Sequence, residues 1–158
     1  MNVMPSMTHY MELLASNQPW NLILFMAIPV ILAEFIAVSE LYILFKRRIS
    51  GGIVTANGLA SIVVGLYFSV VFLYLVVNAA IPLTMMGEWR GPADVIAVGF
   101  YLLGVVPLAA IALLSLGVLG RKLAPDRRLA WHATFVGVFL VVAHVAMIFG
   151  MLNPNVLA

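Results

Sequence analysis

The chain is organised around the segment from Asn21 to Phe45, which reads NLILFMAIPVILAEFIAVSELYILF. It is almost continuously apolar and exceeds the roughly 20 residues that a helix needs to cross a hydrocarbon core about 30 Å thick. Two carboxylates interrupt it, Glu34 near its middle and Glu40 about 9 Å further along at the helical rise. An ionisable group at that depth is costly without compensation, so the group that compensates Glu34 becomes the central question.

The composition of the whole chain is that of a membrane protein. Of its 158 residues, 65% are hydrophobic and 9% are charged, and the mean hydropathy is +1.15. Soluble domains carry about 25% charged residues, so an ordinary soluble domain is excluded. Cysteine is absent from the sequence, which excludes disulfides, thiolate metal sites and iron–sulfur clusters. The net charge of +2 comes from loop residues, and we expect no nucleic-acid partner.

Four apolar runs predict an all-α fold, an integral membrane four-helix bundle that forms a single transmembrane domain over residues 1–158. The spans are expected at about residues 21–45, 53–83, 94–119 and 129–152. The second run is longer than a bilayer requires, so it should tilt or end early near Pro82. Asp94 is expected to cap the third span.

Two features within the spans predict close and irregular packing. Pro29 and Pro107 each remove one helical hydrogen bond and should kink their helices, and Pro29 frees the carbonyl of Phe25. A stripe of small and polar residues recurs every four positions along the second span and allows close helix approach. Its members are Asn57, Ser61, Gly65 and Ser69.

Residues 1–20 predict a short amphipathic helix that lies in the membrane interface, because Met4, Met7, Met11 and Leu14 recur at helical spacing. The orientation follows from the loop cations. Seven of the eight basic residues fall in the first and third loops, and the second loop holds only Arg90. The positive-inside rule therefore predicts that both termini face outward.

The ionisable residues of the first and last spans form two tiers by depth. At the helical rise Glu34 and His144 fall within about 6 Å of each other in depth, and Glu40 and His132 within about 3 Å. A facing Glu34–His144 pair could relay protons or bind a cation, with Asn78 capping the site from above. The simpler alternative is a protonated Glu34 bonded to a hydroxyl, with Glu40 reaching toward the loop cations and His132 interfacial.

Methionine provides a second candidate site. Eight of the nine methionines are expected in the outer half or outer interface, and Met147 and Met151 share a helix face with His144. Thioether and imidazole groups suit copper(I) or the iron of a b-type haem, so His144, Met147, Met151 and His9 are candidate metal ligands. The alternative is that these methionines only fill gaps in apolar packing.

The histidine count limits haem binding, and catalytic motifs are missing. The chain has three histidines, His9, His132 and His144, too few for two haems with paired histidine ligands. One haem on His144 or His132, or one shared between subunits, stays open. The sequence contains no HExxH, Walker or GxSxG motif, so we do not expect an enzyme.

Two stretches, NQPWNLILFMAIPVILAE and AWHATFVGVFLVVAHVAMIFGML, resemble a small bacterial four-span membrane family of unknown function. The similar parts lie around Asn17–Glu34 and Trp131–Leu152. The resemblance implies a multi-pass protein of the bacterial inner membrane, whose termini would then lie on the periplasmic side. It directs attention to Glu34, His132 and His144 and implies no activity.

Three functions remain open at this point. The first is binding or conduction of a cation, either a proton or a transition-metal ion such as copper or iron, at a buried Glu/His site. The second is an electron-transfer subunit with a b-type haem, and the third is a structural or assembly subunit. A single polar site without an internal repeat predicts a homo-oligomer or a larger complex in the lipid bilayer.

Overall fold

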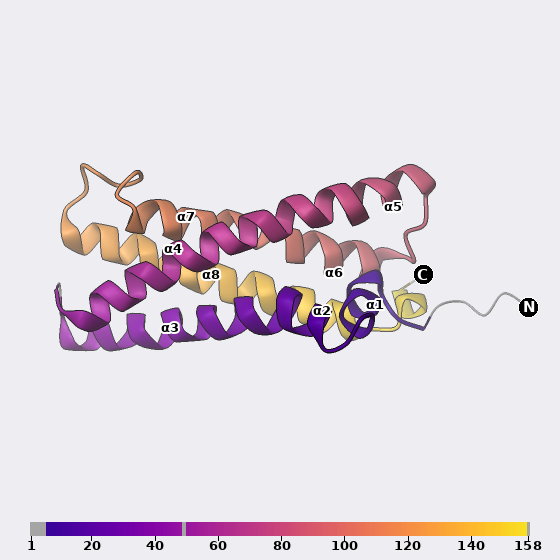
Figure 1. Cartoon of the computed structure of the whole chain (residues 1–158), viewed down its shortest axis with the longest axis horizontal. Coiled ribbons are helices and arrows are strands. Elements are labelled where there is room, and N and C mark those ends of the chain that lie inside the picture. Colours follow the sequence, from indigo (N-terminus) through magenta and orange to yellow (C-terminus); the bar gives the residue numbers. More distant parts are fainter. Residues whose placement is uncertain (1–5, 49, 158) are drawn as a thin grey trace, which may run out of the picture.

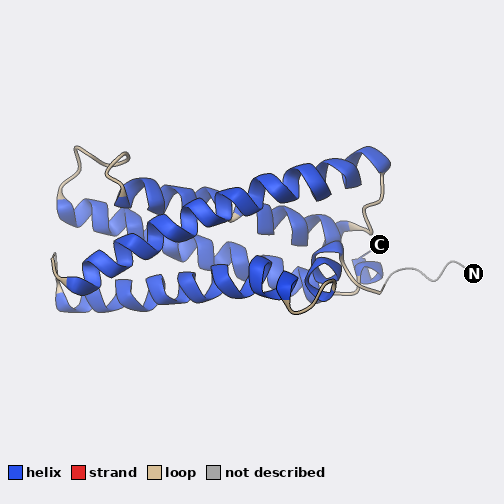
Figure 2. Cartoon of the chain, viewed as in Figure 1, coloured by secondary structure: helices blue, strands red, loops and turns tan. Residues whose placement is uncertain are grey.

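The structure, a computed structural model, describes residues 6–48 and 50–157 and is helical, with no strand in those ranges (Figures 1 and 2). Four of its helical segments are long and apolar enough to cross a membrane, and they lie side by side as a bundle. Their bounds are Trp20–Lys46, Gly52–Met86, Pro92–Ser115 and Pro125–Met151. The predicted all-helical fold is confirmed, with four helices long and apolar enough to span a membrane, while Met1 and Met4 lie outside the described residues.

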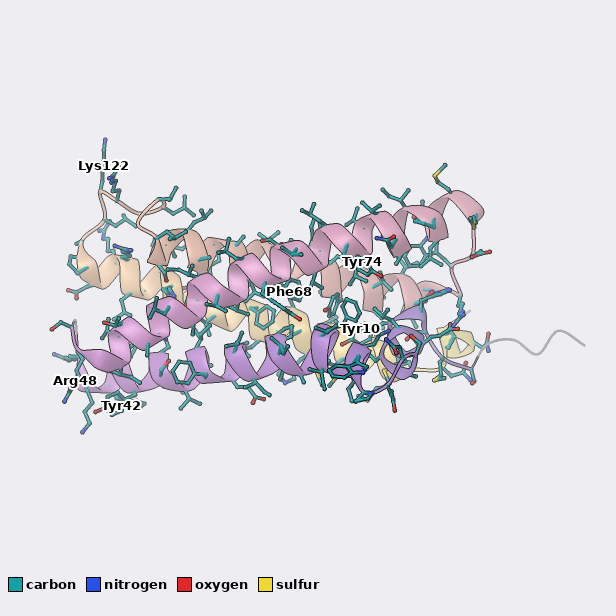
Figure 3. The ribbon with its side chains drawn as sticks, viewed as in Figure 1. Tyr10, Tyr42, Arg48, Phe68, Tyr74 and Lys122 are labelled. Carbon is teal, nitrogen blue, oxygen red and sulfur yellow. The ribbon has the colours of Figure 1, made fainter. Side chains whose placement is uncertain are left out.

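The two ends of the bundle differ in composition. The end that holds the turn after α3 (Ile28–Lys46) and the loop at 116–124 carries most of the basic residues, and we call it the basic end (Figure 1). The opposite end, which we call the terminal end, holds α1 (His9–Ala15), the connection at 87–91 and the residues after Met151. Figure 3 shows Arg48 and Lys122 at the basic end and Tyr10 toward the terminal end.

The first span is irregular before its proline, as Pro29 predicts. It consists of α2 (Trp20–Leu22), the π-helical segment η1 (Ile23–Ala27) and α3 (Ile28–Lys46). Pro29 has no N–H to donate to the carbonyl of Phe25, and the Tyr101 hydroxyl donates to that carbonyl instead at 2.5 Å. The freed acceptor is therefore confirmed, and it ties the first span to the third.

The second span does not end at Pro82, contrary to one of the two expected outcomes. It comprises α4 (Gly52–Leu75), the π-helical segment η2 (Val76–Ala80) and α5 (Ile81–Met86). The π-helical turn before Pro82 accommodates the missing hydrogen bond, because such turns shift the backbone pairing. The helix ends only where Gly87 adopts a left-handed conformation with φ of 68°.

The third span begins and ends earlier than expected. It consists of α6 (Pro92–Leu103) and α7 (Val105–Ser115), which meet at Gly104 just before Pro107. Its cap is Gly91, and the prediction that Asp94 is the cap is wrong. After α7, Gly117 has φ of 73°, and the Val118 N–H donates to Leu113 O at 3.0 Å, which closes a Schellman motif.

The small stripe on α4 makes the closest helix crossing. A Cβ atom at Gly65 would lie 2.5 Å from Ala112 Cβ and 2.6 Å from the Leu108 carbonyl oxygen, so only glycine fits against α7 there. Further toward the terminal end, Phe68 packs against Tyr101 and Phe139 with ring centroids 5.2 and 6.4 Å away. Phe68 lies between the helices in Figure 3. These contacts form an aromatic core.

The fourth span and the short first helix complete the bundle. α8 (Pro125–Met151) starts earlier than expected because Pro125 occupies the first helical turn. α1 packs on the terminal end, where the Thr8 hydroxyl donates to Gly150 O at 2.7 Å. Tyr10 is buried against Gly150, since a Cβ atom there would lie 2.5 Å from the tyrosine ring. A 3₁₀ turn, η3 (Pro154–Leu157), ends the described chain.

Candidate functional site

The structure does not bring Glu34 and His144 together. Both side chains are exposed on the outside of the bundle, and Glu34 takes part in no ion pair with the residues that the structure describes. The Nδ1 atom of His144 lies 2.6 Å from Leu140 O, one turn earlier in its own helix. The prediction that these two residues form a buried pair within the chain is therefore wrong.

The register between α3 and α8 explains this correction. These two helices are aligned by a contact between Glu40 and His132. From that contact Glu34 lies six residues and His144 twelve residues toward the terminal end, so their heights differ by about 9 Å at the helical rise. Six residues also turn a helix by about 240° and twelve by about 120°, which takes both side chains off the inward faces.

Glu40 and His132 are instead the buried pair of the bundle. They are 3% and 7% exposed, and Glu40 Oε2 lies 2.9 Å from His132 Nδ1. The two atoms are within ion-pair distance but lack the alignment of a hydrogen bond, and neither Glu40 oxygen has another partner among the described residues. Glu40 falls on the stripe of α3 that contains Ile36 and Ile43, so the helical period places it inside.

The other ring nitrogen of His132, Nε2, lies near two serine hydroxyls. His132 Nε2 lies 3.0 Å from Ser61 Oγ, with Ser115 Oγ further away at 3.4 Å. The Ser61 hydroxyl donates to Asn57 O at 2.8 Å, so its oxygen is left to accept the Nε2 hydrogen. In the tautomer that carries its hydrogen on Nε2, the Nδ1 lone pair faces the Glu40 carboxyl.

Neighbouring polar groups are satisfied without Glu40. The Asn57 amide donates to Ser39 Oγ at 2.8 Å and to Ile36 O at 3.1 Å. The Ser39 hydroxyl donates in turn to Phe35 O at 2.7 Å. These bonds leave no donor on Ser39 or Asn57 aimed at the carboxyl, so His132 is the only polar contact of Glu40 in the described chain.

A cavity of about 350 Å³ joins this pair to the basic end. Glu40, His132 and Asn57 line its inner part, and the exposed Arg48 lines its outer part. Arg128 also lines it and donates to the carbonyls of α7, among them Ser115 O at 3.4 Å. The space is roomy and polar enough to hold several water molecules, each of which needs about 30 Å³ of liquid volume.

The space between the helices is much smaller toward the terminal end. There the cavity next to Phe68, Tyr101 and Phe139 measures only about 30 Å³, and its lining is mostly apolar and aromatic. Such a space holds at most a single water molecule. The larger of these two cavities, which Glu40 and His132 line, lies toward the basic end.

The remaining predicted residues lie at the terminal end. Asn78 is exposed and donates to Tyr74 O of its own helix at 2.8 Å, so it does not cap either Glu/His pair. His9 and Asn78 line a cavity of about 400 Å³. His9 Nδ1 lies 2.6 Å from Oδ2 of Asp94, whose carboxylate is 0% exposed and also accepts the backbone N–H of His9.

Asp94 is a residue whose role sequence reasoning missed. Its carboxylate accepts the N–H of Arg90 at 3.2 Å, and Arg90 donates in turn to Met7 O at 2.7 Å and to Glu12. Asp94 therefore holds α1 and the 87–91 connection together. A carboxylate in the first helical turn was the available signal, but it is equally typical of an ordinary helix start.

The predicted metal and haem ligands are dispersed. Among the described residues no three His, Asp or Glu side chains lie close enough to share a metal ion. Both ring nitrogens of His132 face protein partners, and the His144 ring stands on the outer surface. Met147 and Met151 line a cavity at the terminal end that includes neither His144 nor His9.

Comparison with known proteins places the chain in a family. A family model described as "Family of unknown function (DUF6803)" matches residues 4–158. The chain belongs to this family. The DUF6803 match confirms the resemblance to a family of unknown function, and its description names no activity. No curated protein and no solved structure matches the chain. The function of this DUF6803 member is therefore argued from its own residues.

Proposed function

We propose that this protein binds a proton at the Glu40–His132 pair and exchanges it through the cavity at the basic end. The observation that carries the proposal is the 2.9 Å contact between two buried titratable groups, one of which has no other polar partner in the described chain. A carboxyl and an imidazole in contact can hold one proton either as a neutral pair or as an ion pair, and the protons taken up belong to the pair. When the Glu40–His132 pair gains one further proton, it acquires a net positive charge.

The contacts favour a proton over a metal ion at this site. A metal ion would need a third ligand, and no suitable third His, Asp or Glu lies near within the described ranges. A purely structural role is also a weaker explanation, because a buried ion pair seldom stabilises a fold more than apolar residues would. Ionisable residues inside membrane spans are more often functional.

The orientation of the bundle decides with which side of the membrane the Glu40–His132 pair exchanges protons. We infer from the positive-inside rule that the basic end faces the cytoplasm and that both termini lie on the periplasmic side of a bacterial inner membrane. The pair would then exchange protons with the cytoplasmic side. α1, with Tyr10 and Leu14 buried and Glu12 exposed, would lie as an amphipathic helix at the outer interface.

The exposed carboxyl of Glu34 supports an oligomer or a partner subunit. It lies near the middle of the first span on the outside of the bundle, where hydrocarbon would surround it in a monomer. A carboxyl in that position is costly, and a second copy or another membrane subunit would cover it. We therefore propose that the protein functions as a homo-oligomer or in a larger complex.

Infrared difference spectroscopy of the protein in lipid vesicles tests the proton site. Acidification should produce the carbonyl band of a protonated carboxylic acid together with imidazole changes, and Glu40→Gln should remove both. Glu34→Gln is the matched control, because it makes the same change on the same helix outside the cavity, and it should leave the Glu40 component intact. A spectrum that Glu40→Gln leaves unaltered would refute the proposal.

A further inference from the structure

Four methionines gather around one cavity at the terminal end, far from the Glu40–His132 pair. Nine methionines less Met1 and Met4 leave seven in the described chain, and four of those seven line a single cavity of about 230 Å³. They come from three elements and are Met11 of α1, Met26 of η1, and Met147 and Met151 of α8. Segments distant in the sequence thus contribute the same side chain to one space.

The register of the bundle sets the heights of these residues. Counted from the Glu40–His132 contact, Met26 lies fourteen residues and Met147 fifteen residues toward the terminal end, so their heights differ by only about 1.5 Å. Met151 follows Met147 by four residues and therefore lies on the same helix face one turn higher.

The docking of α1 adds the fourth methionine. The bond between the Thr8 hydroxyl and Gly150 O holds the start of α1 against α8, and Met11 donates its backbone N–H to Thr8 Oγ1 at 3.3 Å. The Tyr10 ring packs directly on Gly150, because glycine has no side chain to block the contact. Met11 is thus held in place against the end of α8 by contacts that do not involve its own sulfur.

The lining has the chemistry of a soft-metal site. None of the described residues that line the cavity is charged, and besides the thioethers the polar groups are the Tyr10 hydroxyl and the Gln18 amide. Neutral thioethers select soft ions such as copper(I), whereas magnesium and calcium need oxygen ligands. Met151 is 68% exposed, so an ion could enter from the terminal end.

We propose that Met11, Met26, Met147 and Met151 form a binding site for a soft monovalent cation, copper(I) or silver(I). Thioethers do not take up protons near neutral pH, so affinity should change little with pH. A site of imidazole or carboxylate ligands would instead lose affinity on acidification, because its ligands must be deprotonated. The site is independent of the proton-binding function proposed above.

Silver(I) is the probe, because it has the ligand preference of copper(I) without its redox chemistry. The full-length protein in detergent should bind one silver ion per chain, and X-ray absorption should show sulfur as the first-shell ligand. Met26→Leu and Met147→Leu should each weaken silver binding by about tenfold or more. Mutation of residues that only support a metal ligand already causes a loss of about this size. Leucine keeps the side chain apolar and close in volume.

The controls use methionines of the same end that lie outside the cavity. Met85→Leu and Met86→Leu, both at exposed positions, should leave silver binding unchanged, as should His144→Ala. A first shell of nitrogen or oxygen, the absence of stoichiometric binding, or an equal loss in the control variants would overturn the proposal. The X-ray absorption spectrum of the unaltered protein identifies the atoms that bind silver even if a variant fails to fold.

Discussion

Removal of one partner from the Glu40–His132 pair should destabilise the bundle far more than removal of both. His132→Leu leaves the Glu40 carboxyl without a polar contact, a change that costs about 3–5 kcal/mol at buried pairs. We expect the lower value, about 3 kcal/mol, because the adjacent cavity admits water. Glu40→Leu leaves only Nδ1 without a partner and should cost about 1–3 kcal/mol.

The double variant Glu40→Leu/His132→Leu should lie within about 1 kcal/mol of the unaltered protein, since apolar residues of similar volume often replace a buried pair without loss. Reversible unfolding in mixed micelles measures the four free energies of this cycle. Glu34→Leu and His144→Leu form the matched control cycle, and they should be additive within about 0.5 kcal/mol because the two side chains do not touch. If the double variant loses the sum of the single losses, Glu40 and His132 are not coupled and the reasoning fails.

Three further predictions concern packing, α1 and orientation. Gly65→Ala should lower the free energy of unfolding by about 1–3 kcal/mol, because the added methyl group overpacks against α7. Gly58→Ala, which has open space around its Cβ, should be neutral or stabilising. Thermal unfolding compares the two variants. Burial raises the pKa of the Tyr10 phenol from 10.0 to about 12. The docking of α1 should therefore be fully stable below pH 10 and weaken as the pH rises toward 12. Hydrogen exchange measures this effect, which should be absent in Tyr10→Phe. Because the chain lacks cysteine, Lys122→Cys and Glu88→Cys can be labelled singly, and an impermeant thiol reagent added outside cells should reach only residue 88.

Hydropathy and proline chemistry predicted much of the fold. The four spans follow from the lengths of the apolar runs, and the free carbonyl of Phe25 follows from the missing N–H of Pro29. The sequence could not reveal that Tyr101 would bind that carbonyl, because the partner comes from another span. The observed ends of the third span also differ from the predicted ones, because they depend on Gly91 and Gly117 rather than on hydropathy.

The candidate site was only partly predictable. Depth counting favoured Glu34 because it lies nearer the middle of its span, but depth does not give the rotation of a helix about its axis. The inward faces became clear only from the packing, which buries Glu40 and His132 and exposes Glu34 and His144. The cluster of methionines was likewise hidden, because it needs the fold of α1 over the end of α8.

The ¹⁵N spectrum of the His132 ring, recorded on the protein in bilayers over a pH series, tests proton binding at the Glu40–His132 pair. We expect Nδ1, which faces the Glu40 carboxyl, to gain a proton on acidification. The same titration should be altered in Glu40→Gln and unaltered in Glu34→Gln. An Nδ1 resonance that does not respond to pH, or that responds identically in Glu40→Gln, would contradict proton binding at the Glu40–His132 pair.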